Sequence, residues 1–504
     1  MKFIKYLLII IAISACSLNK ESPNFIFIYT DDQRFDTIGL ISQNEVITPN
    51  LDRLAKSGAI MSNTYNMGGW HGAVCVASRS MIISGKSLWK AKENLDSENI
   101  DIEKAILNSW PKILKNHGYR TYMTGKWHVN LPVNKLFDIV KDPKPGMPND
   151  NGPVFYKQVI KWKEESNDLR ELSDYMPSGY GRPTNEKDNS WSPTDSIFGG
   201  FWQGGKHWSE LIADNAIEFI DDSQNFKDPF FMYLAFNAPH DPRQSPKKFL
   251  DMYPIEKISL PKNYLPKHPF MYEIGNQPKL RDEALAPYPR TEFAVKKHIQ
   301  EYYAIITHLD EQVGKIMKHL ENLNLMDNTY IIFTSDHGLS VGQHGLLGKQ
   351  SLYEHSIRVP MIIYGPDIEA NSIYNQDIYL QDIFPTTLDL ANIKIPNSID
   401  FKSFKDVVVN KKNQKIHDAI YGTYSCCQSD FNDYQRMIRK DDYKLIIFPK
   451  NKRMELYNLK DDPYEISNLA YKKQNSQLVK NLFDDLIVLQ QKMQDTLDLK
   501  RIFN

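Results

Sequence analysis

The sequence predicts an α/β fold with a large, mostly parallel sheet flanked by helices and a smaller α+β subdomain at the C-terminal end. Apolar runs of strand length recur before Ile395, and their continuous apolar character is typical of strands covered on both faces. Segments with helical periodicity separate these runs, an alternation that indicates a parallel sheet. After Ile395 the runs become shorter and are separated by Asp, Lys and Asn, which indicates a second, smaller sheet.

The elements of the main sheet follow one another along the chain. The first predicted strand spans residues 24–30, with the sequence NFIFIYT. A helix is predicted from Thr48 to Lys56, because Pro49 is favoured in a first helical turn. The other predicted strands span residues 119–124, 229–236, 329–334 and 359–364. One further predicted helix ends at residue 117, and two others span residues 207–220 and 299–320.

Two further regions differ from this pattern. Residues 131–200 are polar and rich in Pro, Gly and Asn, so we expect surface loops over the ligand-binding edge of the sheet. The predicted C-terminal elements are strands at residues 419–421, 443–448 and 455–457 and a closing helix at residues 478–497. We therefore expect a processed segment at residues 1–15, a main domain at residues 22–395 and a C-terminal subdomain at residues 396–504.

Composition excludes several classes of protein. Hydrophobic residues make up 41% and charged residues 24% of the 504 residues, which is globular composition and excludes disorder, collagen and coiled coil. The 61 basic and 62 acidic residues give a net charge of −1, so there is no electrostatic case for a nucleic-acid partner. Four cysteines are too few for a disulfide scaffold.

The N-terminal segment MKFIKYLLIIIAISAC is predicted to be a processing signal. Lys2 and Lys5 make the start of the segment positively charged. The apolar stretch that follows them is too short to span a bilayer. Small residues then precede Cys16, which resembles the lipobox of bacterial lipoproteins, where the cysteine is diacylated; a plain secretory signal peptide is the alternative. We expect an exported protein, lipid-anchored to a bacterial membrane and facing either the periplasm or the cell surface.

Polar side chains follow four of the predicted strands at the carboxyl ends, where open α/β sheets bind ligands. They are Asp31 and Asp32, then Lys126 and His128, then His240, then Asp336 and His337. Three carboxylates with few soft ligands favour calcium or magnesium over zinc. The alternatives are that the aspartates cap a helix or turn, and that the lysines and histidines are solvated or packed in the core.

Cys75 lies in the segment GAVCVASRSMIISG, which places it at the start of a helix, where N–H groups and the helix dipole stabilise anions. An ordinary nucleophilic cysteine is one interpretation, although no Cys-His signature accompanies it. The spacing Cys75-x-Ala77-x-Arg79 matches the maturation motif of the type I, formylglycine-dependent sulfatases of the alkaline-phosphatase-like superfamily. The sequence resembles this family, and within it the exported bacterial carbohydrate sulfatases, over almost the whole mature chain.

The resemblance implies a role for each matching residue. Cys75 matches the position that a maturation enzyme converts to formylglycine (3-oxoalanine). The residues that match the ligands of one calcium ion are Asp31, Asp32, Asp336 and His337, together with the converted Cys75; the family often has Asn in place of His337. The residues that match the groups holding the sulfuryl oxygens are Arg79, Lys126 and Lys349. The segments FKSFKDVV and ELYNLKDDPYEISNLA resemble the family's linker and C-terminal subdomain.

The mechanism that the resemblance implies is physically consistent with these residues. A hydrated formylglycine oxygen, acidified by calcium, attacks sulfur while fixed positive charges stabilise the sulfuryl oxygens. His240 would protonate the leaving alcohol, and His128 would take a proton from the remaining hydroxyl, which expels sulfate.

The implied substrate is a sulfated polysaccharide or oligosaccharide. Candidate substrate contacts near the motifs are Arg34, Trp70, His71, Trp202, His207, Arg243 and His344, and a packing role is at least as plausible for each. Two other functions stay open: a phosphodiesterase or phosphonate hydrolase of the same superfamily, and a lipoprotein that binds sulfated glycans without turnover. Expected partners are the carbohydrate, the maturation enzyme and the membrane, with no nucleic acid.

Overall fold

The computed structural model of this chain describes residues 22–42, 44–148, 152–425 and 435–503. The predicted processing segment, the predicted lipidation site Cys16 and the adjacent pair Cys426 and Cys427 lie outside the described residues. Among the helices of these ranges, none combines the length and the apolar character needed to cross a bilayer.

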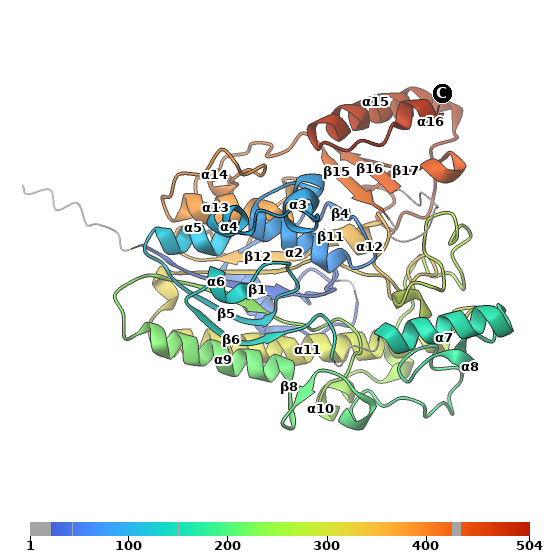
Figure 1. Ribbon diagram of the computed structural model, residues 1–504, viewed down its shortest axis with the longest axis horizontal. Coiled ribbons are helices and arrows are strands. Elements are labelled where there is room, and N and C mark those ends of the chain that lie inside the picture. The colour runs from blue at the N-terminus through green and yellow to red at the C-terminus, as the bar shows by residue number, and fades with distance from the viewer. Residues whose placement is uncertain (1–21, 43, 149–151, 426–434, 504) are drawn as a thin grey trace, which may run out of the picture.

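An eight-stranded sheet forms the centre of the fold (Figure 1). In spatial order its strands are β13 (Ser372–Tyr374), β2 (Ala59–Met61), β12 (Met361–Tyr364), β10 (Thr329–Ser335), β1 (Asn24–Thr30), β9 (Phe230–Ala235), β5 (Arg120–Lys126) and β6 (Ile139–Lys144). The strands from β10 to β6 run parallel, whereas β12 is antiparallel to both β10 and β2. The prediction of a mostly parallel sheet is confirmed.

Strand β1 lies between β10 and β9 and is parallel to both. Thr30 is opposite Ser335 of β10, and Tyr29 is opposite Ala235 of β9. The carboxyl ends of the three strands therefore meet at one edge of the sheet, which brings together the segments that begin at Asp31 and Asp336.

Helices cover both faces of the sheet (Figure 1). On one face Ile26 and Ile28 belong to a core shared with α1 (Pro49–Ser57), α9 (Trp208–Ser223) and α11 (Glu292–Asn322). On the other, Phe25, Phe27 and Tyr29 belong to a core shared with α2 (Val74–Ser84), α5 (Trp110–Asn116) and α13 (Ile383–Leu390). Successive residues of a strand point to opposite faces, so this double cover explains the continuous apolar run of β1.

Two predictions about the main sheet were wrong in part. The strand expected at residues 359–364 is divided into β11 (Arg358–Val359), which pairs with β3 (Thr64–Tyr65) in another sheet, and β12. Pro360, which separates them, has no N–H to donate to a strand ladder. Residues 131–200 are not only loops, because they contain strand β6 and helix α7 (Gly152–Glu165).

Helix α7 was not predicted, because its apolar residues are sparse. Phe155, Val159 and Trp162 recur at helical spacing and are buried, with exposed fractions of 0%, 4% and 4%. The surrounding polar residues gave the segment the composition of a loop.

The C-terminal sheet has the order β18 (Arg453–Asn458), β17 (Tyr443–Phe448), β16 (Gln435–Lys440), β15 (Ile420–Tyr424) and β4 (Gly68–Gly69). Helix α15 (Ser476–Lys492) packs against it and ends before residue 497, the predicted end. Strand β4 comes from the segment just before α2. Gly68 has φ +94°, and a Cβ atom there would lie 1.9 Å from the carbonyl oxygen of Thr423, so only glycine fits this contact. The C-terminal sheet therefore holds the chain that leads into Cys75.

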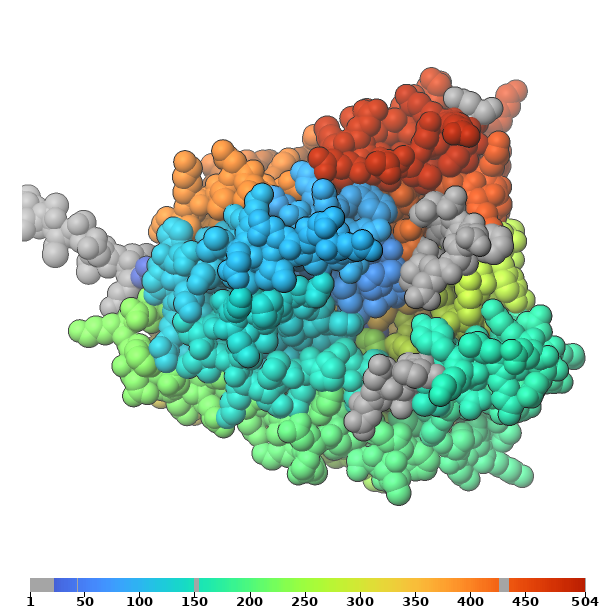
Figure 2. All heavy atoms as spheres, viewed as in Figure 1, coloured from blue at the N-terminus to red at the C-terminus, as the bar shows by residue number. Residues whose placement is uncertain are grey.

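The remaining helices and strands are α3 (Leu88–Leu95), α4 (Ile102–Leu107), α6 (Val133–Leu136), α8 (Leu172–Tyr175), α10 (Lys247–Leu250), α12 (Glu354–Ile357), α14 (Lys405–Val408), α16 (Leu499–Phe503), β7 (Trp202–Gln203), β8 (Lys206–His207) and β14 (Ile378–Tyr379). Figure 2 shows the C-terminal residues packed directly against the rest of the molecule.

Candidate active site

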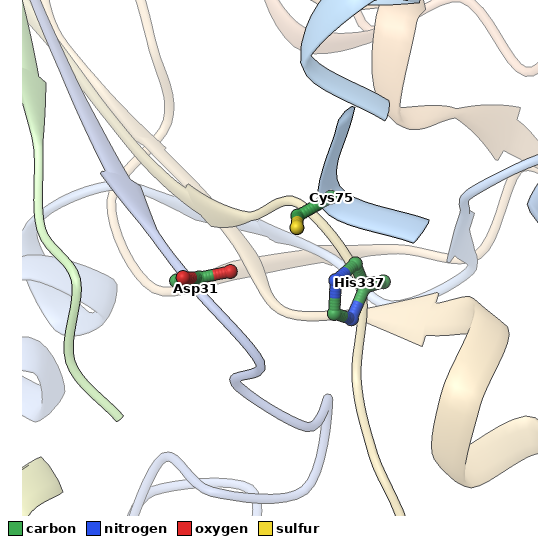
Figure 3. A group of neighbouring side chains, drawn as sticks. All are labelled: Asp31, Cys75 and His337. Carbon is green, nitrogen blue, oxygen red and sulfur yellow. The ribbon is translucent and has the colours of Figure 1, made fainter. Parts of the chain in front are cut away.

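The predicted site residues converge at the carboxyl edge of the sheet. Asp31 and Asp32 follow β1, Lys126 ends β5, and Asp336 follows β10. Cys75 enters from the first turn of α2, and Figure 3 shows its sulfur atom on the side that faces Asp31 and His337.

Among the described residues Cys75 is the only cysteine; it is buried and forms no disulfide. Its Sγ atom lies 3.3 Å from Nδ1 of His128. It is the second residue of α2, an 11-residue helix whose N-cap Ala73 makes no side-chain cap hydrogen bond. Unsatisfied N–H groups at such a helix start favour a negatively charged group nearby.

A group of buried oxygen and nitrogen atoms beside Cys75 has the composition of a cation site. One ligand atom from each of Asp31, Asp32, Asp336 and His337 lies within 4.8 Å of the others, and all four residues are buried. Asp31 Oδ1 and His337 Nε2 have no hydrogen-bond partner among the described residues. Because unpaired buried polar atoms are costly, this donor set fits a bound hard cation.

Three cations compensate the three carboxylates. Lys126 forms an ion pair with Asp31, the Nζ atom of Lys349 lies 2.8 Å from Asp32 Oδ1, and Arg79 Nε lies 3.0 Å from Asp336 Oδ2. This inner group is therefore close to neutral by itself. A divalent cation would make it positive, which is the environment that an anionic ester requires.

The pKa values of the carboxylates reflect this crowding. Burial raises the pKa of Asp32 well above its usual value, and the neighbouring Asp31, Asp282 and Asp336 add to the increase against the effect of Lys349. Burial also raises the pKa of Asp336, but nearby positive groups outweigh it and hold that pKa below its ordinary value.

Arg79 acts within the protein rather than at an open surface. Its Nε donates to Asp336, its Nη1 donates to the carbonyl of Lys126 at 3.0 Å, and its guanidinium lies 4.6 Å from the ring centroid of Tyr29. These contacts orient Asp336 and the end of β5.

The two predicted acid–base histidines contact different members of the site: His128 lies next to Cys75, and His240 lies next to Asp32. Burial and Lys126 lower the pKa of His128 to about 3, so its ring is neutral at ordinary pH. Nδ1 of His240 donates to the carbonyl of Asp241 at 2.6 Å, which leaves Nε2 facing Asp32 at 3.7 Å. Burial, followed by Lys349, lowers the pKa of His240 well below its ordinary value.

Three residues of the site were not predicted. Arg281 forms ion pairs with Asp241 and Asp282, and its Nη2 lies 3.4 Å from His240 Nε2. Asp241 was detectable in principle, because it directly follows His240 in the NAPHDP segment. Arg281 and Asp282 lie in an irregular segment with neither a strand before them nor a motif around them, so no sequence signal identified them.

The predicted substrate contacts are spread more widely and many have internal partners. Arg34 pairs with Asp36, the Trp70 ring N–H donates to Asp96 at 2.6 Å, His71 Nδ1 accepts from Ala73 N–H, Trp202 donates to Gln244, His207 Nδ1 accepts from Ser209 N–H, and His344 stacks on Tyr353 with ring centroids 4.3 Å apart. Arg243 differs, because its Nε and Nη2 atoms have no partner among the described residues. Substrate binding by these residues stays a prediction.

Comparison with known proteins identifies the family. The model of the family described as Sulfatase matches residues 23–393, and that described as N-sulphoglucosamine sulphohydrolase, C-terminal, matches residues 342–492. An arylsulfatase of Clostridium perfringens is 29% identical over 491 residues, which cover 92% of this chain and 94% of that protein.

Solved structures share the fold. A protein in complex with its substrate D-glucosamine-2-N,6-O-disulfate has a TM-score of 0.68 at 22% identity, covering 94% of this chain and 99% of the other. A phosphonate monoester hydrolase from Silicibacter pomeroyi has a TM-score of 0.71 at 17% identity, covering 94% and 96% of the two chains. These likenesses show that the chain shares the fold of both proteins. The match of the family model over residues 23–393 shows that this chain belongs to the sulfatase family, and it is a sulfuric ester hydrolase.

Proposed function

We propose that this sulfatase hydrolyses sulfate esters carried by a polysaccharide or oligosaccharide, using formylglycine formed from Cys75 and one calcium ion. The observation that carries the proposal is that Cys75 lies beside Asp31 Oδ1 and His337 Nε2, two buried ligand atoms that have no hydrogen-bond partner among the described residues; His337 Nε2 is 3.2 Å from Asp32 Oδ1, another of the proposed ligands. The proposed nucleophile position and the proposed cation ligands thus belong to one buried cluster.

The ligands Asp31, Asp32, Asp336 and His337 would hold calcium together with the converted side chain at position 75. Bound calcium would supply Lewis acidity, which lowers the pKa of a hydroxyl group and polarises a sulfuryl oxygen. Oxygen donors outnumber the single imidazole, which favours calcium over zinc.

The residues of the chain would then divide the remaining work. Lys126 and Lys349 supply fixed ammonium groups for the charge that develops on the sulfuryl oxygens. His128, whose Nδ1 is 3.3 Å from Cys75 Sγ, is placed to accept a proton from the side chain at position 75. His240 approaches Asp32 through Nε2, and a bound anionic ester would favour the imidazolium form from which it would donate a proton to the leaving alcohol, while Arg79 orients Asp336.

The carbohydrate substrate is supported by the sulfated amino sugar bound to the structural relative described above. The competing phosphonate hydrolase function shares the fold but would be expected to need a second metal or further basic groups. Among the described residues, the group that could hold a second metal is Asp32, His240 and Asp241. Asp241 already forms an ion pair with Arg281. The non-catalytic alternative would be expected to lack a ligand or a lysine, and this chain retains each of them.

We further propose that maturation requires a formylglycine-generating enzyme, and that the chain is exported and lipid-anchored through Cys16. The support is the Cys75-x-Ala77-x-Arg79 motif and the small residues before Cys16.

The test is the release of inorganic sulfate from defined sulfated oligosaccharides, drawn from glycosaminoglycans, algal galactans and ulvan, beside phosphate diesters and phosphonate monoesters. We expect release from at least one carbohydrate, with the desulfated position assigned from the product, and loss of release in Cys75→Ala. Faster turnover of a phosphonate than of every sulfate would support the competing hydrolase. Tight glycan binding without any release would support the non-catalytic protein.

A further inference from the structure

A small pocket opens beside His240, and its wall includes the residues that follow that histidine. The pocket has a volume of about 210 Å³ and is lined by Asp241, Pro242, Arg243, Arg182 and Trp191, among others. It is smaller than the roughly 300–1,000 Å³ pockets that hold drug-sized ligands. A single sugar substituent or ring is therefore a better match than an extended chain.

Arg243 is the unusual residue of this pocket. It is 2% exposed, yet no carboxylate forms an ion pair with it among the described residues, and its Nε and Nη2 atoms have no hydrogen-bond partner. Its one polar side-chain contact joins Nη1 to Nδ1 of His298 at 3.4 Å. Nε2 of His298 donates to the carbonyl of Arg182 at 2.9 Å, so Nδ1 of the neutral ring is an acceptor and supplies no negative charge.

The other charged groups of the wall are already paired. Arg182 forms an ion pair with Glu301, and Asp241 forms one with Arg281. Arg243 therefore has no carboxylate bound to it directly: it lies 5.5 Å from the ring centroid of Tyr302 and acts only through space on Asp241, whose carboxylate is already paired with Arg281. A buried charge of this kind is costly unless a ligand compensates it.

The unpaired atoms are also of one chemical kind. Among the pocket-lining residues the buried side-chain atoms without a partner are Arg243 Nε, Arg243 Nη2, Arg182 Nε and Trp191 Nε1. Each is a hydrogen-bond donor, so a complementary ligand must supply acceptors. Nε and Nη2 lie on the same edge of a guanidinium group, and this fork matches two oxygen atoms of a carboxylate or sulfate.

The loop of residues 191–200, which supplies Trp191 to the pocket wall, is held in place. Nε2 of Gln244 donates to the carbonyls of Ser192 and Asp195 at 2.7 and 2.8 Å, and Oε1 accepts from the Trp202 ring N–H at 2.7 Å. Ser245 N–H also donates to the carbonyl of Pro193 at 3.0 Å. These bonds join the loop to the segment after His240, so the pocket is formed before a ligand arrives.

We infer that the pocket lined by Arg243 and Trp191 binds a second acidic group of the substrate, a carboxylate or a further sulfate, on the sugar whose ester is hydrolysed or on its neighbour. This inference rests on the proposed function and extends it, because it makes the enzyme selective for sugars that carry an acidic group beside the scissile ester. Arg243 supplies the charge and the fork, and Trp191 supplies an additional N–H.

The test compares kcat/KM within two matched pairs of substrates. One pair is a sulfated uronic acid glycoside and its carboxyl-reduced form; the other is a disulfated sugar and its monosulfated form. The parent enzyme should prefer the acidic member of at least one pair by roughly tenfold or more, since a hydrogen bond to a charged group contributes about 1.5–3 kcal/mol. The pair that shows the preference identifies the acidic group.

Arg243→Gln should lower this preference roughly 10- to 100-fold, as expected for the loss of a charged hydrogen-bonded pair. Arg243→Lys should retain part of it, because the charge stays but the fork is lost. Trp191→Phe keeps an aromatic ring and removes only the N–H, so a smaller decrease is expected. The matched control is Arg53→Gln: Arg53 lies in α1 and forms a surface ion pair with Glu321 of α11, so this variant should keep the parent's preference.

Thermal unfolding separates a binding role from a structural one. Because Arg243 is a buried charge without a directly bound carboxylate, Arg243→Gln should unfold at the same temperature as the parent or higher. A preference that survives in Arg243→Gln, or a parent that treats both members of both pairs alike, overturns the inference and leaves the proposed function intact. Release of sulfate from none of these sugars or the wider panel would instead refute the proposed function.

Discussion

The Sγ atom of Cys75 lies 3.3 Å from Nδ1 of His128, although the two residues come from different elements of the fold. Cys75 belongs to the first turn of α2, whereas His128 follows β5 with the left-handed φ of +55°. The unusual backbone at His128 turns the chain at the sheet edge. Burial and Lys126 keep the His128 ring neutral, so it can accept a proton from position 75.

The first prediction concerns Cys75 itself. Active enzyme should contain formylglycine at position 75, and Cys75→Ala should fold like the parent and lose measurable sulfate release. Peptide mass spectrometry of position 75 is the measurement, with Asp484→Asn on the exposed face of α15 as a control for expression and handling. Fully active enzyme with only the unmodified thiol would refute the conversion.

The second prediction concerns the cation. Calcium should raise the thermal midpoint of chelator-treated protein, because a ligand at 100 times its Kd stabilises the folded state by about 2.7 kcal/mol. His337→Ala and Asp336→Asn should reduce this gain, since each removes a predicted ligand. Full activity in metal-free protein would contradict a calcium requirement, and zinc at full occupancy would contradict the choice of a hard cation.

The third prediction separates His240 from Lys126 through the leaving group. A sugar alkoxide needs a proton as it leaves, whereas nitrophenolate leaves without one. His240→Ala should therefore slow desulfation of a carbohydrate roughly 100-fold or more and affect an aryl sulfate far less. Lys126→Ala should slow both, because charge develops on the sulfuryl oxygens in each reaction.

Two results would reassign these roles. An equal loss on both substrates in His240→Ala would make His240 a sulfate-binding residue. A selective loss in His128→Ala would mean that the roles of the two histidines are exchanged.

The fourth prediction concerns Cys16. In whole-cell fractionation the parent should be recovered with the membrane, and Cys16→Ala should be released from it, because the variant lacks the site of lipid attachment. Equal membrane association of the two proteins would show that the lipobox interpretation is wrong.

The fifth prediction is a pH dependence away from the active site. Asp310 of α11 accepts hydrogen bonds from the backbone N–H groups of Asn50 and Leu51 at the start of α1. Burial raises the pKa of Asp310 from 3.8 to about 6. The folded state therefore retains a proton that the unfolded chain has already lost, and this contribution to stability is complete below about pH 4 and disappears as the pH rises through 6.

Asp310→Asn removes that titration. The parent's advantage over the variant in thermal midpoint should shrink as the pH increases from 4 to 7, by an amount that corresponds to ~3 kcal/mol. Asp52→Asn serves as the comparison. Asp52 also lies near the start of α1, but it accepts hydrogen bonds from Leu40 N–H and the Thr48 hydroxyl. A difference between parent and Asp310→Asn that stays constant over this range would contradict the predicted titration.

The sequence by itself was sufficient for the central strands and the residues that follow them. Within strand 24–30, residues 25–29 are apolar without interruption because both faces of β1 are covered, and such a run is recognisable without any knowledge of its neighbours. Parallel strands place their carboxyl ends at one edge, so Asp31 and Asp336 could be expected to meet from topology alone. The motif around Cys75 added the chemistry through resemblance to a family.

Only the tertiary structure decided which side chains are paired there and which are left without a partner. Arg281 reaches His240 and Asp241 from an irregular segment, and Arg243 lies in a pocket in which its fork has no internal acceptor. Neither the position of Arg281 nor the lack of an acceptor for Arg243 produces a periodicity or a spacing in the sequence. Whether a buried charge is compensated depends on atoms contributed by segments far apart in the chain, and those distances exist only once the chain has folded.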